Sequence, residues 1–206
     1  YLDWKRHPDP ETLERMMPLL QYRYRHALPN LIVTTDDAAL DFVLANREEL
    51  FPGVPVVFSG ISLEKGTSVL QDHGMLTGVA ERLDVAGTIG LALQLQPQAT
   101  QAILVFENSE SGKPVGQEAE AVLRAVAPGV NIQLWNDKPA EEIHQLAATL
   151  PPDTFLFFAS YIRDAKGRVL PMQQFADLLF ETSTAPVYCV NDFVVGHHVQ
   201  IGRAHV

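Results

Sequence analysis

The residue types that carry out most enzymatic chemistry form no recognisable catalytic pattern in this chain. Gly112-Lys113 is followed by Pro114 and lacks the upstream glycine of a phosphate-binding loop. Phe58-Ser59-Gly60 lacks the flanking glycine of a nucleophile elbow. No G-x-G-x-x-G segment follows an apolar run. We therefore expect a non-catalytic domain.

Histidine and cysteine residues do not indicate a metal site or a nucleophile either. His197 and His198 are adjacent, so in a strand they point to opposite faces, and no third ligand stands at chelating distance. Cys189 lies in the apolar run 187–190 and is expected to be a small core residue. The sequence thus predicts no metal and no cofactor.

The remaining polar candidates share one position, because each follows a short apolar run. In open parallel sheets ligands bind at the carboxyl ends of the strands. Each residue alone could instead cap a helix or form a turn. Together they predict a polar ligand site, and our proposed ligand-binding residues are Asp36, Ser59, Gly60, Ile61, Glu107, Asn108, Ser160, Tyr161 and Asp192.

The chemistry of these side chains suits a small polar solute. The carboxylates of Asp36, Glu107 and Asp192 could pair with an ammonium group, and the Ser59 hydroxyl with backbone amides could hold a carboxylate. An amino acid or another amine-bearing metabolite is the leading expectation. A neutral sugar or a nucleoside would accept the same hydrogen bonds, so this alternative stays open.

Strand and helix patterns that would position these residues alternate along the whole chain. Apolar runs predict seven strands, at 31–34, 54–58, 76–80, 102–106, 132–135, 155–159 and 187–190. Apolar residues at helical spacing predict six helices, at 13–24, 40–44, 85–93, 119–126, 143–150 and 172–179. Strands that are apolar at every position are typical of parallel sheets with helices on both faces. The fold class is therefore α/β.

Seven strands exceed what one compact sheet needs at this length, so two lobes are predicted. The segment 76–84 has no predicted helix between its strand and the preceding one, and a strand that enters a new sheet needs no crossover helix. We expect a first lobe over 1–80, completed by 190–200, and a second lobe over 81–189. The chain would cross between them at 79–84 and 190–193.

Composition limits the class of partner. The 206 residues include 15 Lys and Arg against 25 Asp and Glu, which gives a formal net charge of −10. Such a chain offers no broad positive field for nucleic acid or for anionic lipid. We expect no nucleic-acid partner.

Both ends of the chain predict a fragment of a longer protein. The sequence starts at Tyr1 without Met. The last six residues, 201–206, back-translate into the opening of a common short-read sequencing adapter and are interpreted as a non-native tail.

Several segments resemble, in order, the ABC transporter substrate-binding-protein family, in the form found as the sensor region of bacterial membrane histidine kinases and diguanylate cyclases. They are PNLIVTTDDAALDF at 29–42, LFPGVPVVFSGI at 50–61, LTGV at 76–79, the helix from Asp84, LQLQP at 93–97, and PVY at 186–188 leading into NDF at 191–193. The similarity covers nearly the whole chain. The family's first strand and helix are absent, as is a glycine-rich segment after Gly196, so the first lobe is expected to be incomplete.

The resemblance implies a two-lobed, class I periplasmic-binding-protein-like fold that closes on a small solute. It implies an extracytoplasmic domain, periplasmic and anchored in the bacterial inner membrane through segments outside this chain, that serves signal transduction or ABC uptake. A homodimer of the full-length protein is a further expectation. The alternatives are a cytoplasmic repressor-type effector-binding domain and a flavodoxin-like or hydrolase enzyme.

Overall fold

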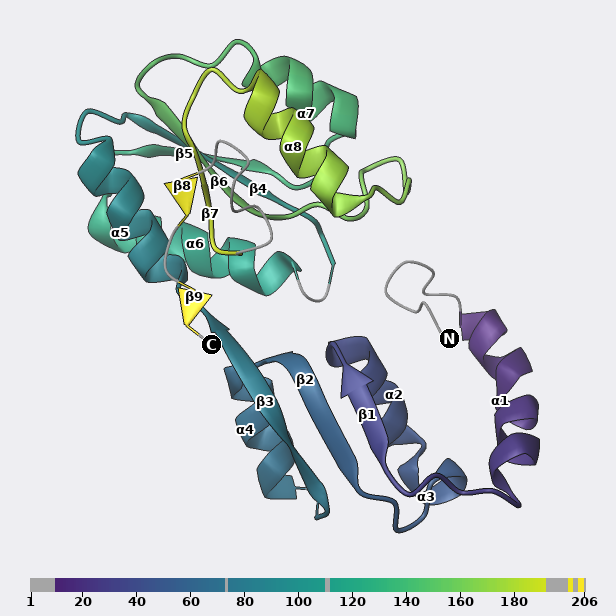
Figure 1. Ribbon diagram of the computed structural model, residues 1–206. Coiled ribbons are helices and arrows are strands. Elements are labelled where there is room, and N and C mark those ends of the chain that lie inside the picture. Colours follow the sequence, from purple (N-terminus) through teal and green to yellow (C-terminus); the bar gives the residue numbers. More distant parts are fainter. Residues whose placement is uncertain (1–9, 73, 110–111, 192–199, 202–203, 206) are drawn as a thin grey trace. The chain divides into compact units, whose positions relative to one another are not determined.

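The computed structural model describes residues 10–72, 74–109, 112–191, 200–201 and 204–205 (Figure 1). The described chain divides into two compact units, with the division between Arg82 and Leu83. Each unit has its own β-sheet, and every printed pairing between neighbouring strands is parallel. The α/β class with parallel sheets flanked by helices, predicted from the sequence, is confirmed.

The first unit contains the strands β1, β2 and β3, which are parallel neighbours in this order. Its elements in chain order are α1 Pro10–Tyr24, β1 Ile32–Thr35, α2 Asp37–Ala45, α3 Arg47–Leu50, β2 Val56–Ser62, α4 Leu63–Asp72 and β3 Leu76–Leu83.

The core of the first unit lies on one face of this sheet. Phe58 and Ile61 of β2 pack with Leu40 and Val43 of α2. On the opposite face Val33 and Val79 are 65% and 60% exposed. β1, β2 and β3 follow one another across the sheet in chain order. Right-handed crossovers between such strands place the connecting helices on the same face of the sheet, which explains why α2 and α4 lie on one face.

A helix that the sequence analysis did not predict, α4, precedes β3. Its segment is short, rich in polar residues and contains Gly66, and the sequence analysis therefore did not identify it as a helix. The missing side chain at Gly66 lets the helix approach the sheet, since an added Cβ would lie 2.8 Å from the Cβ of Ala80. β3 therefore continues the first sheet as the parallel neighbour of β2, and the expectation of a strand without a crossover helix was wrong.

The second unit has the strand order β5-β4-β6-β7-β8. In order of appearance this is 2-1-3-4-5, the flavodoxin-like doubly wound order. The elements are α5 Val85–Leu95, β4 Gln101–Phe106, α6 Gly112–Val126, β5 Asn131–Trp135, α7 Ala140–Ala147, β6 Thr154–Ser160, α8 Met172–Thr182, β7 Val187–Cys189 and β8 Gln200–Ile201.

Helices cover both faces of the second sheet (Figure 1). Leu104 and Phe157 pack on one face with Ile89 of α5 and Leu123 of α6. Residues of the same two strands, such as Val105 and Phe158, pack on the other face with α7 and α8. This double coverage explains why β4 and β6 are apolar at consecutive positions.

The end of the chain differs from the expectation. Gln200 and Ile201 pair with Tyr188 and Cys189 in the second sheet, whereas the first lobe was expected to take residues up to 200. Part of the presumed tail forms a short strand, β9, at Ala204–His205. Residues 192–199 lie outside the described chain. Within the described residues, no helix is long and apolar enough to cross a bilayer.

Candidate functional site

The proposed ligand residues lie in both units, and each group is described in its own unit. In the first unit Asp36 directly follows β1, whereas Ser59, Gly60 and Ile61 lie inside β2, which continues to Ser62 instead of ending before Ser59 as the sequence predicted. Glu107, Asn108, Ser160 and Tyr161 belong to the ends of β4 and β6 in the second unit. Asp192 lies outside the described residues.

In the first unit, Asp36 and Ser59 are joined through the backbone. The amide of Asp36 donates to the carbonyl oxygen of Ser59 at 3.0 Å. Asp36 has φ 76° and ψ 157°, a region that residues other than glycine rarely adopt. Gly60 also has a positive φ of 68°, where β2 shifts register against β3 between Ser59 and Ile61. Strain and a bulge close together are typical of functional sites.

The side chains of this group are not all free to meet a ligand. Asp36 Oδ1 accepts from the amide of Asp37 at 2.7 Å and so caps α2. Ile61 is 1% exposed and lies in the core. Ser59 is half-buried and Gly60 is exposed, so these two residues present polar atoms at the bulge within β2.

A lysine that the sequence analysis did not single out lies next to this group. Lys65 Nζ lies 2.7 Å from Asp41 Oδ2 and 3.4 Å from Asp37 Oδ1. Burial lowers the pKa of Lys65, but the hydrogen bond to Asp41 and the charges of both carboxylates outweigh burial and raise it. This ion-pair group fixes α2 to α4.

In the second unit, Glu107 and Ser160 meet at the topological switch point. β4 and β6 are neighbours, and the helices that follow them cover opposite faces of the sheet. In sheets of this order, ligands bind outside the carboxyl ends of the two strands at this point. Ser160 Oγ lies 3.4 Å from Glu107 Oε1, although 53 residues separate them in sequence.

Glu107 organises the loop that follows β6. Its side chain is buried, at 3% exposure, and Oε2 accepts from the backbone amides of Ile162 at 2.9 Å and Arg163 at 3.1 Å. Buried carboxylates require such donors. Glu107 therefore holds the loop after β6 in place, and its carboxylate is not free to pair with an ammonium group.

The first residue of α6, Gly112, lies close to Glu107 and Ser160. This approach is possible because glycine has no side chain. An added Cβ at Gly112 would lie 2.7 Å from Glu107 Cγ and 3.2 Å from Ser160 Oγ. The amide of Gly112 donates to Ser109 Oγ at 3.0 Å. Asn108 is exposed next to them. The polar groups gathered at this strand end thus come from β4, β6 and α6.

Tyr161 does not join this group of polar side chains. Its ring is fully buried and stacks on Phe175 with centroids 4.9 Å apart, and its hydroxyl donates to the carbonyl oxygen of Lys138 at 2.6 Å. Burial raises its pKa to about 12. In this arrangement Tyr161 anchors the loop after β5, and its hydroxyl already has a protein partner.

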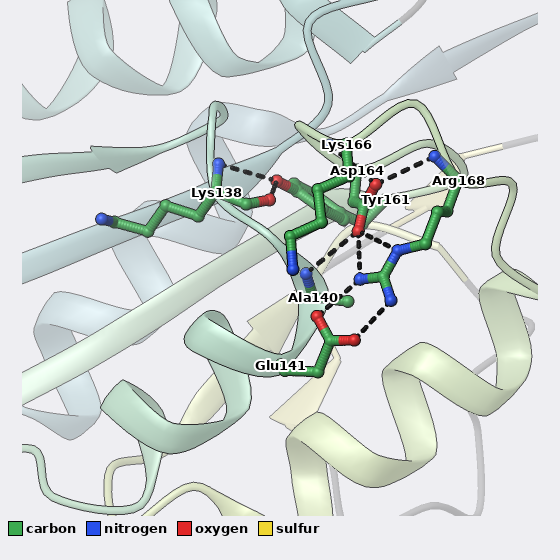
Figure 2. A network of polar contacts seen from close by, with 7 residues as sticks. All are labelled: Lys138, Ala140, Glu141, Tyr161, Asp164, Lys166 and Arg168. Carbon is green, nitrogen blue, oxygen red and sulfur yellow. Dashed lines mark hydrogen bonds and ion pairs between the residues drawn. The ribbon is translucent and has the colours of Figure 1, made fainter.

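A network centred on Asp164 fixes the loop after β6 (Figure 2). The Asp164 side chain is fully buried and accepts from the amides of Lys166 and Arg168, both at 3.0 Å, and from Arg168 Nε at 2.9 Å. The amide of Ala140, at the start of α7, donates to Asp164 Oδ2 at 3.4 Å. The loop is thereby tied to the second sheet's helix layer.

Arg168 extends this network to the surface. Figure 2 shows its guanidinium group between Asp164 and Glu141, and it forms ion pairs with both. The hydrogen bond from Arg168 lowers the pKa of Glu141 to about 2. Burial raises the pKa of Asp164, but the donors from Arg168 and the backbone outweigh burial and lower it. The sequence analysis did not identify this network. An Asp at position 164 followed by Gly167 is nevertheless typical of a turn, and this pattern could have indicated the loop.

The described residues offer no metal site, as no group of three or more His, Cys, Asp or Glu side chains comes together there. Burial raises the pKa of the Cys189 thiol to about 11, which opposes thiolate formation. His197 and His198 lie outside the described residues. A separate shallow pocket of about 160 Å³ lies at the opposite edge of the second sheet, beside Ala127 and Val130.

Comparison with known proteins gives similarities among solved structures. The chain is similar to an extracellular ligand-binding receptor from Verminephrobacter eiseniae, with 14% identity, a TM-score of 0.49, and coverage of 87% of this chain and 48% of that chain. It is similar to the xylose-binding transcription activator XylR, with 16% identity, a TM-score of 0.47, and coverage of 90% and 53%. Full-length LpoA from Haemophilus influenzae gives 13% identity, a TM-score of 0.37, and coverage of 82% and 30%.

The chain spans about half the length of the Verminephrobacter receptor. No protein-family model matches the chain, and no curated protein matches it significantly.

Proposed function

We propose that this chain is a non-catalytic domain that binds a small polar solute at the carboxyl ends of its parallel strands. The observation that carries the proposal is the switch point of the second sheet, where Glu107, Ser160 and Gly112 bring polar groups from three elements together. The loop after β6 is held by backbone and side-chain hydrogen bonds. A site whose groups are fixed before binding needs little ordering when the solute arrives.

We further propose that the domain senses its solute by lobe closure. The solute would favour one arrangement of the lobes by its difference in affinity between arrangements, which is a population shift. The domain would then act as an extracytoplasmic sensor, or as a component of an ABC uptake system, with membrane attachment outside this chain. Small-angle scattering that shows no change with a bound solute would contradict this mechanism.

Binding is tested by thermal shift and calorimetry with the whole chain. The panel contains amino acids, amines, sugars, nucleosides and carboxylic acids, and at least one member is expected to stabilise the fold. Ser160→Ala and Ser59→Ala are each expected to weaken binding about tenfold, because each removes a hydrogen bond to the solute.

Ser68→Ala, on the exposed face of α4, is the matched control and should bind like the parent. If both site variants also bind like the parent, the strand ends are not the site. If no member of the panel binds the parent, the proposed function is wrong for these solute classes.

A further inference from the structure

The hydroxyl group of Ser160 lies beside a carboxylate that other donors already hold in place. Glu107 Oε2 accepts from two backbone amides, and Glu107 Oε1 lies 3.4 Å from Ser160 Oγ. In this contact the Ser160 hydroxyl is the donor and Glu107 Oε1 is the acceptor.

This arrangement fixes what Ser160 can offer to a solute. A serine hydroxyl has one O–H donor and two acceptor lone pairs. When the donor points to Glu107, only lone pairs of Ser160 Oγ remain for a solute at this strand end. Gly112, at the start of α6, has no side chain and so leaves the Ser160 hydroxyl uncovered on this side, where an added Cβ would lie 3.2 Å from Oγ.

We propose that Glu107 is a positioning residue that makes Ser160 a hydrogen-bond acceptor, so that the solute presents an N–H or O–H group to it. The inference rests on the proposed function, because it concerns the same site. The sequence analysis expected Glu107 to pair directly with an ammonium group of the solute. In this proposal Glu107 instead acts on the solute through Ser160. The class of ligand is a solute with a donor, such as an amine or an alcohol, at this position.

Glu107→Gln tests the inference without removing the frame of the site. The side-chain oxygen of glutamine can accept from Ile162 and Arg163 as Glu107 Oε2 does. The amide NH₂ then faces Ser160 Oγ and donates to it, which turns the serine proton toward the solute. Glu181→Gln, at an exposed position of α8, is the matched control.

A measurement without solute tests the direction of the Ser160 proton. Infrared spectra of chain labelled with ¹³C in the glutamate carboxyl groups give the band of Glu107 as the band lost in Glu107→Gln. Ser160→Ala is expected to shift this band, because it removes a donor to the carboxylate. An unchanged band would overturn the inference. Amide exchange at Ile162 and Arg163 should stay slow in Glu107→Gln, which shows that the loop is intact.

A measurement with solutes tests the consequence for specificity. The probes are L-serine against O-methyl-L-serine and ethanolamine against 2-methoxyethylamine, in which a methoxy group replaces the donor. The parent and Glu181→Gln are expected to prefer the hydroxyl member, and Glu107→Gln to reduce that preference roughly tenfold. Equal preferences in all three chains contradict the inference. Failure of every solute to bind the parent contradicts the proposed function, while the infrared band still decides the inference.

Discussion

Two residues that follow β4, Glu107 and Gly112, set how closely the polar groups at this strand end approach one another. Glu107 is buried and fully engaged, and Gly112 has no room for a side chain. In the proposed site both residues would therefore support the polar groups rather than contact the solute. The sequence indicated their neighbourhood through their position after an apolar run, but their partners come from segments about 50 residues away.

Gly112→Ala is expected to destabilise the second unit by about 1–3 kcal/mol, because its Cβ would lie 2.7 Å from Glu107 and force α6 outward. The free energy of unfolding from urea titration measures the effect. Gly90→Ala, in α5, is the control, since nothing lies within 4 Å of its added Cβ. It should stabilise the chain by about 0.4–1 kcal/mol. Equal effects at the two positions would show that Gly112 does not set the approach.

Tyr161→Phe is expected to change how stability depends on alkaline pH. Burial raises the pKa of Tyr161 from 10.0 to about 12, so above pH 10 the unfolded chain loses the phenolic proton while the folded chain keeps it. The stability of the parent therefore falls as the pH rises from 10 toward 12. The variant lacks this part of the slope. Tyr22→Phe, at a position that is 72% exposed, should retain the full slope of the parent.

At the scale of elements, the hairpin-like loop after β6 is the part of the site that local hydrogen bonds define best. Arg163 and Val169 form a β-bridge, and the amide of Leu170 donates to Ile162 at 2.7 Å. Asp164 and Arg168 then tie the loop to α7. A loop held in this way can present backbone groups in a fixed geometry.

Arg168→Met is expected to loosen this loop, so that amide exchange at Lys166 and Leu170 becomes faster and the chain less stable. The lowered pKa values of Glu141 and Asp164 mean that the network stabilises the fold above about pH 4.5 and loses this effect as the pH falls toward 2. The variant should show a smaller acid loss. Arg124→Met breaks an exposed pair with Glu120 and should leave both readouts unchanged.

Gly66→Ala tests the role of α4, the helix that the sequence pattern did not reveal. The added Cβ would lie 2.8 Å from Ala80, so we expect a loss of about 1–3 kcal/mol in the free energy of unfolding. Gly74→Ala, with nothing within 4 Å, should change the stability little. A Gly66→Ala chain as stable as the parent would mean that α4 does not pack closely on β3.

The comparison of sequence and structure separates what periodicity can predict from what it cannot. The seven apolar runs lie at β1 to β7, and the six predicted helices lie at α1, α2, α5, α6, α7 and α8, because long apolar periods record burial directly. α3 and α4 were not predicted, because α3 is a single turn of four residues and α4 lies in a polar segment with Gly66, although Val69 of α4 packs against the core of the first unit. Among the candidate site residues, Glu107 and Ser160 come together as neighbouring strand ends. The inward direction of Tyr161 depends on packing against Phe175, which no local pattern records.

At the scale of the whole molecule, the central proposal is that a small solute binds at the carboxyl edge of the second sheet. The most direct measurement is a ¹⁵N NMR titration of the whole chain with a solute that stabilises it. The proposal predicts that the largest amide shifts in the second unit occur at Asn108, Ser109, Gly112, Ile162 and Arg163. Shifts confined to the opposite edge of that sheet, at Ala127 and Val130 beside the shallow pocket, would contradict it.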